Sequence, residues 1–180
     1  MKVILFFLFI LHSANATHEP TCNDAYENNG HVEIKGTTVS NTAFQGCTAL
    51  TNVTMPNVTS IGESAFQNTG LTTVDMPNVT SIGNSAFYGC TALESVDMPK
   101  VTSIDESAFQ NTGLTTVDMP NVTSIGAYAF YKTVLTNVTM PNVETIGGGA
   151  FQGCTALTNV TMPKVTKIDY YAFKDCTALE

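Results

Sequence analysis

A repeat of 21 or 22 residues runs from residue 32 to the end of the chain, and it limits the possible folds more than any other feature. Longer units contain Gly-Cys-Thr-Ala-Leu at Cys90 and Cys154, and shorter ones contain Asn-Thr-Gly-Leu or Lys-Thr-Val-Leu. A unit this short cannot bury its own apolar side chains, whereas stacked units bury each other's. The sequence therefore predicts a solenoid. The repeat is marked by Met55-Pro56, Met76-Pro77, Met98-Pro99, Met119-Pro120, Met140-Pro141 and Met162-Pro163.

Each unit predicts a short strand followed by a turn. In residues 50–55, Val53 and Met55 alternate with polar residues, as in a strand, and Pro56 ends it because proline lacks an N–H. Residues 63–66 are predicted to form one helical turn. One phenylalanine per unit, from Phe44 to Phe173, is expected to stack inside the solenoid. We expect a positive φ at Gly62, Gly83, Gly126 and Gly147, although Asp105 and Asp169 occupy this place in two units.

The unit reads Leu-x-x-Val-x-Met-Pro-Asn-Val-Thr-Ser-Ile-Gly-x-Ser-Ala-Phe-x-x-Cys/Thr, and over residues 32–180 it resembles the leucine-rich repeats of the BspA-like, or treponemal-type, family. The resemblance implies a leucine-rich-repeat arc with a parallel sheet on its concave face and short helical or irregular segments on its convex side. It also implies kinship with secreted or cell-surface adhesion and recognition proteins of bacteria and protist parasites. No enzymatic activity and no cofactor come with that family.

If Val53 and Met55 face inward, alternate strand residues line the presumed concave face and are the candidate ligand-binding positions. Asp75, Asp97 and Asp118 fall in three consecutive units, so their like charges are expected about 5 Å apart. This arrangement suggests a site for a basic peptide or for Ca²⁺; the simpler interpretation is a solvated row, because Ca²⁺ needs six to eight oxygen ligands. The candidate residues are Asn52, Thr54, Thr73, Asp75, Ser95, Asp97, Thr116, Asp118, Asn137, Thr139, Asn159 and Thr161.

The abundant threonines raise a further alternative, an ice-binding face. A curved sheet with charges in its middle coils is a poor template for ice.

Asn57, Asn78 and Asn121 stand in Asn-x-Ser/Thr sequons after proline and are candidate glycosylation sites. The sequons are also explained as a by-product of the repeat. Further sequons on the strands, at Asn52, Asn137 and Asn159, would place glycans on the candidate face.

Cysteine and threonine share one repeat position, which indicates a small buried side chain. It is filled by Cys47, Thr69, Cys90, Thr112, Thr133, Cys154 and Cys176. Parallel, in-register side chains do not readily meet disulfide geometry, so Cys154 and Cys176 are expected to stay reduced. Cys22 and Cys47 are a plausible disulfide pair in an oxidising compartment. No CxxC motif indicates a zinc or redox site.

The first residues indicate export. Lys2, an apolar run over residues 3–11 and Ala14-Asn15-Ala16 form a signal peptide with cleavage predicted after residue 16. Residues 17–31 would then cap residues 32–180, and the last coil is incomplete, which favours end-to-end self-association. No other apolar run is long enough to span a membrane. We expect a secreted or surface-associated protein.

The composition of the chain excludes some classes of function. Fifteen Asp+Glu against seven Lys+Arg give a formal charge of −8, which argues against nucleic-acid binding. The only histidines, His12, His18 and His31, precede the repeats, so the commonest general base is missing from them. The sequence therefore predicts a non-enzymatic protein that recognises an extracellular protein or glycan through its concave face. A structural or decoy surface protein without a specific ligand is the alternative.

Overall fold

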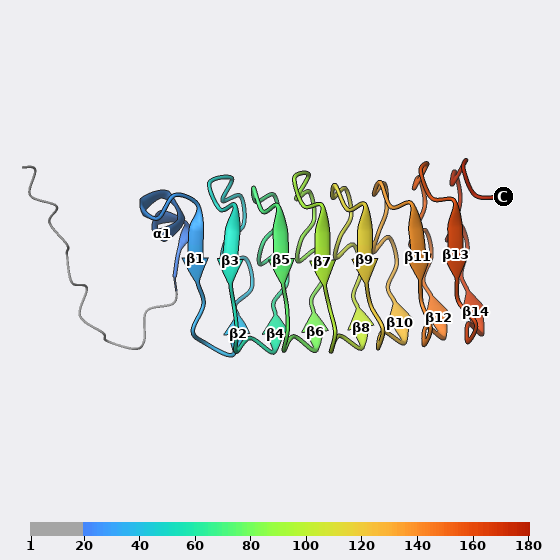
Figure 1. The fold of residues 1–180 in the computed structure, drawn as a ribbon, viewed down its shortest axis with the longest axis horizontal. Coiled ribbons are helices and arrows are strands. Elements are labelled where there is room, and N and C mark those ends of the chain that lie inside the picture. The colour runs from blue at the N-terminus through green and yellow to red at the C-terminus, as the bar shows by residue number, and fades with distance from the viewer. Residues whose placement is uncertain (1–19) are drawn as a thin grey trace, which may run out of the picture.

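A computed structural model describes residues 20–180 as a stack of similar coils, each contributing two short strands (Figure 1). The odd-numbered strands are β1 (His31–Glu33), β3 (Asn52–Thr54), β5 (Thr73–Asp75), β7 (Ser95–Asp97), β9 (Thr116–Asp118), β11 (Asn137–Thr139) and β13 (Asn159–Thr161). The even-numbered strands are β2 (Thr38–Val39), β4 (Ser60–Ile61), β6 (Ser81–Ile82), β8 (Ser103–Ile104), β10 (Ser124–Ile125), β12 (Thr145–Ile146) and β14 (Lys167–Ile168). The predicted solenoid is confirmed. Residues 1–16, where the signal peptide is predicted, lie outside the described residues.

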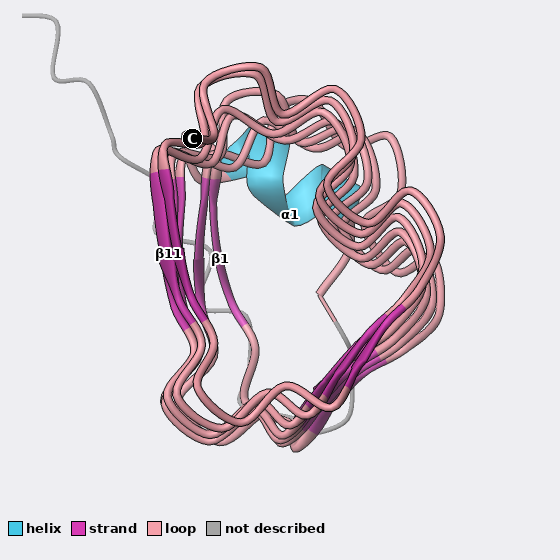
Figure 2. Cartoon of the chain, turned by 90° about the vertical axis from the view of Figure 1, so that its right-hand side faces the viewer, coloured by secondary structure: helices cyan, strands magenta, loops and turns pink. Residues whose placement is uncertain are grey.

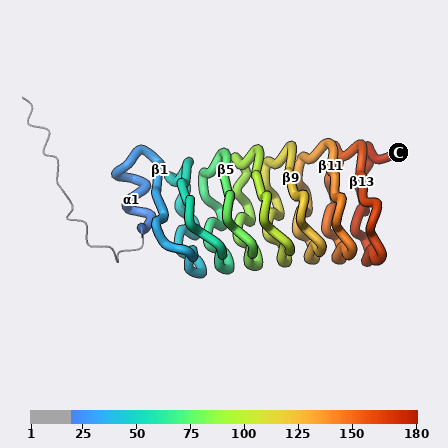
Figure 3. Tube along the Cα trace, turned by 60° about the horizontal axis from the view of Figure 1, so that its bottom comes forward, coloured from blue at the N-terminus to red at the C-terminus, as the bar shows by residue number. Residues whose placement is uncertain are grey.

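The coils follow one another in a nearly straight row, with little of the curvature implied by the resemblance (Figures 1 and 3). Viewed along the row, the odd and even strands form two separate sides of each coil (Figure 2). All pairings between coils are parallel and in register, so a residue of one coil lies beside its repeat equivalent in the next. The repeat therefore fixes which side chains become neighbours.

The even strands form a continuous seven-stranded sheet that the sequence did not predict. Each even strand has only two residues, and in β2 to β12 the second, such as Ile61 or Ile82, is buried in the core. In β14, in the last coil, Ile168 is 46% exposed. A pattern of two residues is too short to show the alternation by which strands are recognised. The odd strands are hydrogen-bonded in three groups, with breaks between β3 and β5 and between β9 and β11.

One stack of phenylalanines occupies the core, as predicted. Adjacent rings from Phe44 to Phe173 lie 5.2–5.4 Å apart between centroids and are nearly parallel. Phe66, Phe87, Phe109, Phe130 and Phe151 are fully buried, whereas Phe173 in the last coil is half-buried. Each ring covers its neighbours, so the central rings depend on coils on both sides.

The segment after each even strand is a series of turns and not the predicted helical turn. Its backbone enters the left-handed region at Ser64 (φ 52°), and the equivalents Thr42, Ser85, Ser107, Tyr128, Gly149 and Tyr171 do the same. A second left-handed residue lies four positions later, such as Asn68 or Lys132. The expectation of a positive φ at Gly62 and its equivalents is wrong. Those glycines permit close packing instead, since a Cβ on Gly126 would lie 2.7 Å from the Asp105 carbonyl carbon.

The Cys/Thr position is buried, as predicted, and the two residue types bond differently. The thiols of Cys90, Cys154 and Cys176 donate to a phenylalanine carbonyl of the preceding coil, at 3.0 Å for Cys90 and Phe66. The hydroxyls of Thr112 and Thr133 donate to the phenylalanine carbonyl three residues earlier in their own coil. Each choice gives the buried polar hydrogen an acceptor, so the position tolerates both residues.

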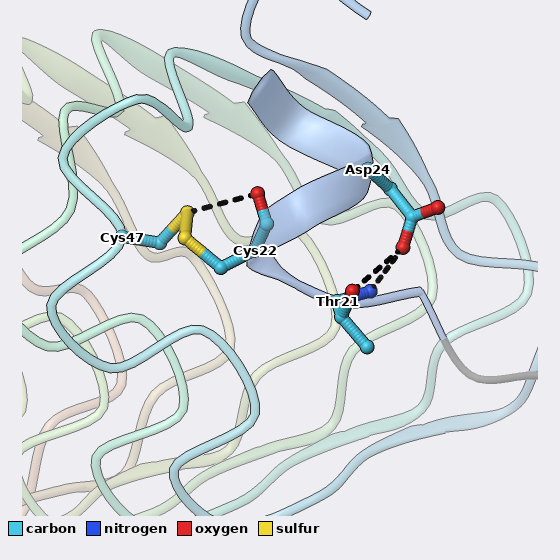
Figure 4. Close-up of a disulfide and its surroundings, with 4 residues drawn as sticks. All are labelled: Thr21, Cys22, Asp24 and Cys47. Carbon is cyan, nitrogen blue, oxygen red and sulfur yellow. Dashed lines mark hydrogen bonds between the residues drawn. A yellow bond between two sulfur atoms is a disulfide. The ribbon is translucent and has the colours of Figure 1, made fainter. Parts of the chain in front are cut away.

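Helix α1 (Cys22–Glu27) lies at the start of the stack and is joined to the first coil by a disulfide between Cys22 and Cys47 (Figure 4). The Asp24 carboxylate accepts hydrogen bonds from the Thr21 N–H, at 2.6 Å, and from the Thr21 hydroxyl, at 3.0 Å. These bonds fix the start of the helix. Ala25 is fully buried against the first coil. Cys90, Cys154 and Cys176 are free thiols, which confirms the expectation for Cys154 and Cys176.

Candidate ligand-binding face

The outward side chains of the odd strands form two rows, which together we call the odd-strand face. All twelve candidate residues lie in these rows, and the pairing registers place consecutive members side by side except across the two breaks. The first row is His31, Asn52, Thr73, Ser95, Thr116, Asn137 and Asn159. The second row is Glu33, Thr54, Asp75, Asp97, Asp118, Thr139 and Thr161.

Two members of these rows, His31 and Glu33, are not among the twelve candidate residues, which begin on the strand around Val53. Both lie on β1, which pairs with β3 in register. His31 Nδ1 is 2.9 Å from Asn52 Oδ1. The signal was present in the sequence, since His31-Val32-Glu33 alternates like Asn52-Val53-Thr54 and precedes it by one period.

Asp75, Asp97 and Asp118 form an uninterrupted acidic row on β5, β7 and β9. Asp97 pairs with Asp75 on one side and Asp118 on the other, and all three side chains are exposed. Strands in one sheet lie about 4.8 Å apart, so the carboxylates repel each other at short range. Within residues 20–180, the only ion pair joins Lys167 and Asp169, so no lysine neutralises the acidic row.

The geometry gives no support to the Ca²⁺ version of the hypothesis. In the described part of the chain, no group of three or more His, Cys, Asp or Glu side chains is arranged to hold a metal ion. Carboxylates in a flat row approach a cation from one side only, whereas Ca²⁺ needs ligands around it. A ligand with several separate positive charges fits such a row better.

A shallow groove of about 300 Å³ opens on the odd-strand face where the ladder between β3 and β5 is broken. Its walls include the outward residues Asn52, Thr54 and Thr73, with Asp75 at the edge that adjoins the acidic row. Pro56 and Pro77, which end the two strands, also line the groove. The groove combines apolar proline surface with a carboxylate in one place.

The sequon asparagines after proline have a structural role that the sequence did not reveal. The side-chain amides of Asn78 and Asn121 donate to the carbonyls of Pro56 and Pro99 in the preceding coil, at 2.7 and 2.6 Å. Asn142, which is not in a sequon, makes the same bond to Pro120. Asn57 is exposed. The bonds explain why asparagine recurs there, and glycosylation at the three sequons stays a prediction.

The outward side of the even strands displays serine and threonine hydroxyls. Ser81 donates to the Ser60 hydroxyl at 3.1 Å, and the Thr80 hydroxyl donates to the Thr59 carbonyl at 3.1 Å. These hydroxyls therefore hold neighbouring coils together. A regular array of hydroxyls therefore lies on this side, whereas the acidic row of Asp75, Asp97 and Asp118 lies on the odd-strand face.

A family model for the BspA type leucine-rich repeat region matches the chain in six copies over residues 25–132 and 123–180. The chain belongs to this family. In the part of the chain that the structure describes, no helix has the length and apolar character needed to cross a membrane.

Three solved structures illustrate the similarity. A leucine-rich cell-surface protein from Faecalibacterium prausnitzii is 28% identical, with a TM-score of 0.42 over 83% of this chain and 58% of the other. A leucine-rich repeat protein from Bacteroides ovatus is 22% identical, with a TM-score of 0.44 over 79% and 56%. One from Eubacterium ventriosum is 25% identical, with a TM-score of 0.48 over 83% and 37%. The chain thus spans 37–58% of these solved chains. A comparison with curated proteins returns no match.

Proposed function

We propose that this chain is an exported leucine-rich-repeat protein that recognises an extracellular protein or glycan through its odd-strand face. The observation that carries the proposal is the in-register acidic row of Asp75, Asp97 and Asp118 beside the groove between β3 and β5. The signal peptide predicted at residues 1–16 and the disulfide between Cys22 and Cys47 support export, because disulfides persist in oxidising compartments.

The acidic row favours a basic segment of the partner. Three carboxylates in a line attract lysine or arginine side chains and raise the association rate, and the effect weakens as salt screens the charges. The surrounding candidate residues are short asparagine, serine and threonine side chains, which lose little conformational entropy on binding. The groove beside Asp75 would receive an apolar or prolyl group of the same ligand.

The residues also support binding without catalysis. No histidine follows His31, and the serine and threonine hydroxyls recur in every coil without a base that distinguishes one of them. A nucleophilic mechanism needs such a base within hydrogen-bonding reach. We therefore propose no enzymatic activity for this chain.

The test is binding of residues 17–180 to extracellular-matrix proteins, glycans, whole cells and a lysine-rich peptide. The variant D75N/D97N/D118N removes the acidic row. The matched control E63Q/D105N/E106Q changes the net charge equally, away from the odd-strand face. We expect saturable binding that the first variant weakens about tenfold or more and the control leaves nearly unchanged.

An equal loss of binding in both variants would show that binding depends on the net charge of the chain and not on the acidic row. Binding that neither variant changes would move the site elsewhere on the solenoid. No binding to any probe would favour the alternative, a structural or decoy surface protein. Unaltered thermal stability in Ca²⁺ and absence of thermal hysteresis in concentrated solution would exclude the metal-binding and ice-binding alternatives.

A further inference from the structure

The last coils carry a second surface that differs from the rest of the solenoid. At the left-handed turn position, where other coils have Thr42, Ser64, Ser85 and Ser107, the later coils have Tyr128, Gly149 and Tyr171. Tyr128 is 42% exposed, Tyr171 is 66% exposed and their neighbour Tyr170 is 83% exposed. A solenoid whose core is complete without them has no packing reason to expose these rings.

Backbone hydrogen bonds bring these residues together across three neighbouring coils. The Tyr128 N–H donates to the Gly148 carbonyl, and the Gly149 N–H donates to the Tyr170 carbonyl, both at 3.0 Å. Tyr128 and Tyr171 are therefore two coils apart, about 10 Å along the stack. Between them lies Gly149. A Cβ there would be only 2.5 Å from the Tyr128 ring and 3.2 Å from Gln152 Oε1, so the glycine leaves room for these side chains.

Two lysines lie beside the rings without a carboxylate partner. The ammonium of Lys132 is 5.2 Å from the centre of the Tyr131 ring, and that of Lys174 is 5.1 Å from the centre of the Tyr171 ring. Neither lysine takes part in an ion pair within residues 20–180. Asp175 adjoins Lys174 in sequence, and Asp169 is paired with Lys167. The two ammonium groups are therefore free to meet an anion.

The charge of the chain changes along its length. Residues 17–120 contain two lysines and eleven acidic residues, whereas residues 121–180 contain four lysines and four acidic residues. An anionic ligand is repelled by the first part and not by the second. The tyrosine–lysine surface lies entirely in the second part.

We propose that this surface, formed by Tyr128, Tyr131, Lys132, Gln152, Tyr171 and Lys174, binds a carboxylated or sulfated saccharide. Exposed tyrosine rings offer flat apolar faces to the C–H groups of a sugar ring, with a hydroxyl at the rim. The Gln152 amide supplies both a donor and an acceptor for sugar hydroxyls, and the two lysines supply charge for an acid group. The combination fits an anionic sugar better than a neutral one.

The repeat itself supplies variants that preserve the fold. Y128S/Y171S introduces the residue that Ser64, Ser85 and Ser107 have in the same left-handed conformation. K132N/K174Q introduces the residues of Asn68 and Gln67 at the equivalent positions. The probes are a heparin oligosaccharide, sialyllactose, lactose and poly-glutamate, with binding to residues 17–180 measured by calorimetry at two salt concentrations.

We expect heparin oligosaccharide or sialyllactose to bind, lactose to bind more weakly, and each double variant to weaken binding about tenfold or more. The preferred probe distinguishes sulfate from carboxylate recognition. Absence of saccharide binding would overturn the proposal. If K132N/K174Q weakened heparin binding and Y128S/Y171S did not, the surface would attract any polyanion, and the proposal of a saccharide site would be wrong. If poly-glutamate bound as tightly as the saccharides, the ligand would instead be an acidic peptide. D75N/D97N/D118N should leave saccharide binding intact, so this result is independent of the odd-strand face.

Discussion

Cys22 and Cys47 form a disulfide across 25 residues, with their Cα atoms 5.5 Å apart, and this bond holds helix α1 against the first coil. The first coil would otherwise present Cys47 and Leu50, both fully buried, at an open end of the stack. The disulfide and the buried Ala25 together protect that end.

Removing the disulfide with C22S/C47S is expected to lower the free energy of unfolding by about 3 kcal/mol, because the cross-link restricts the unfolded chain. Urea unfolding of both proteins measures the difference. Cys90→Thr serves as a control, since Thr69 and Thr112 hold the same position in neighbouring coils. A loss no larger than that of the control would mean that α1 contributes little to stability.

Phe109→Ala is expected to destabilise the protein by about 3–5 kcal/mol, because this ring is fully buried between the Phe87 and Phe130 rings. Phe173→Ala should lower the free energy of unfolding clearly less, since Phe173 is half-buried and stacks on one ring only. Chemical denaturation of the two variants gives the comparison. Equal losses would contradict a core in which each ring depends on both neighbours.

The buried thiols are expected to resist thiol reagents until the chain unfolds. Burial raises the pKa of Cys90 and Cys154, and burial, followed by the charge of Cys154, raises the pKa of Cys176 to about 11. Between the unfolded-state pKa of 9.0 and the raised folded-state pKa, the unfolded chain loses the thiol proton while the folded chain keeps it. The contribution of the thiol to stability is therefore complete below pH 9.0 and is lost as the pH rises through the folded-state pKa. The free energy of unfolding should therefore fall between about pH 9 and 11. Ellman titration with and without denaturant, and unfolding across this pH range, test both expectations.

Asp97→Asn is expected to raise the melting temperature slightly at low salt, because Asp97 lies between Asp75 and Asp118 in one register. The gain should disappear in concentrated NaCl, where the repulsion is screened. Glu63→Gln is the control with one charge removed elsewhere. A gain that persists at high salt would point to a cause other than repulsion within the acidic row.

Asn121→Ala is expected to lower the free energy of unfolding by about 1 kcal/mol, because it removes the amide that donates to the Pro99 carbonyl. Asn57→Ala should lower the free energy of unfolding much less, because the preceding coil has Lys35 in place of the proline and Asn57 makes no such bond. Thermal unfolding measures both. If the two losses were alike, the asparagine-to-proline bonds would not explain why asparagine recurs at this position.

The sequence by itself determined the solenoid, the buried face of the odd strands, the phenylalanine stack and the in-register acidic row. These features follow from the repeat, because equivalent residues of stacked coils must become neighbours and the apolar ones must be buried. The spacing of 21 residues from His31 to Asn52 also indicates β1, because it equals one repeat.

Only the tertiary structure decided the second sheet, the left-handed turns and the tyrosine–lysine surface. Two-residue strands such as Ser60–Ile61 have no recognisable period and exist because the coils on both sides supply their hydrogen bonds. Ser64 adopts a positive φ in spite of its side chain because its N–H bonds to the Asn84 carbonyl of the next coil at 2.9 Å. Contacts between coils therefore override local preference at these residues. They also bring Tyr128, Gly149 and Tyr171 together, although these residues are more than twenty positions apart in the chain.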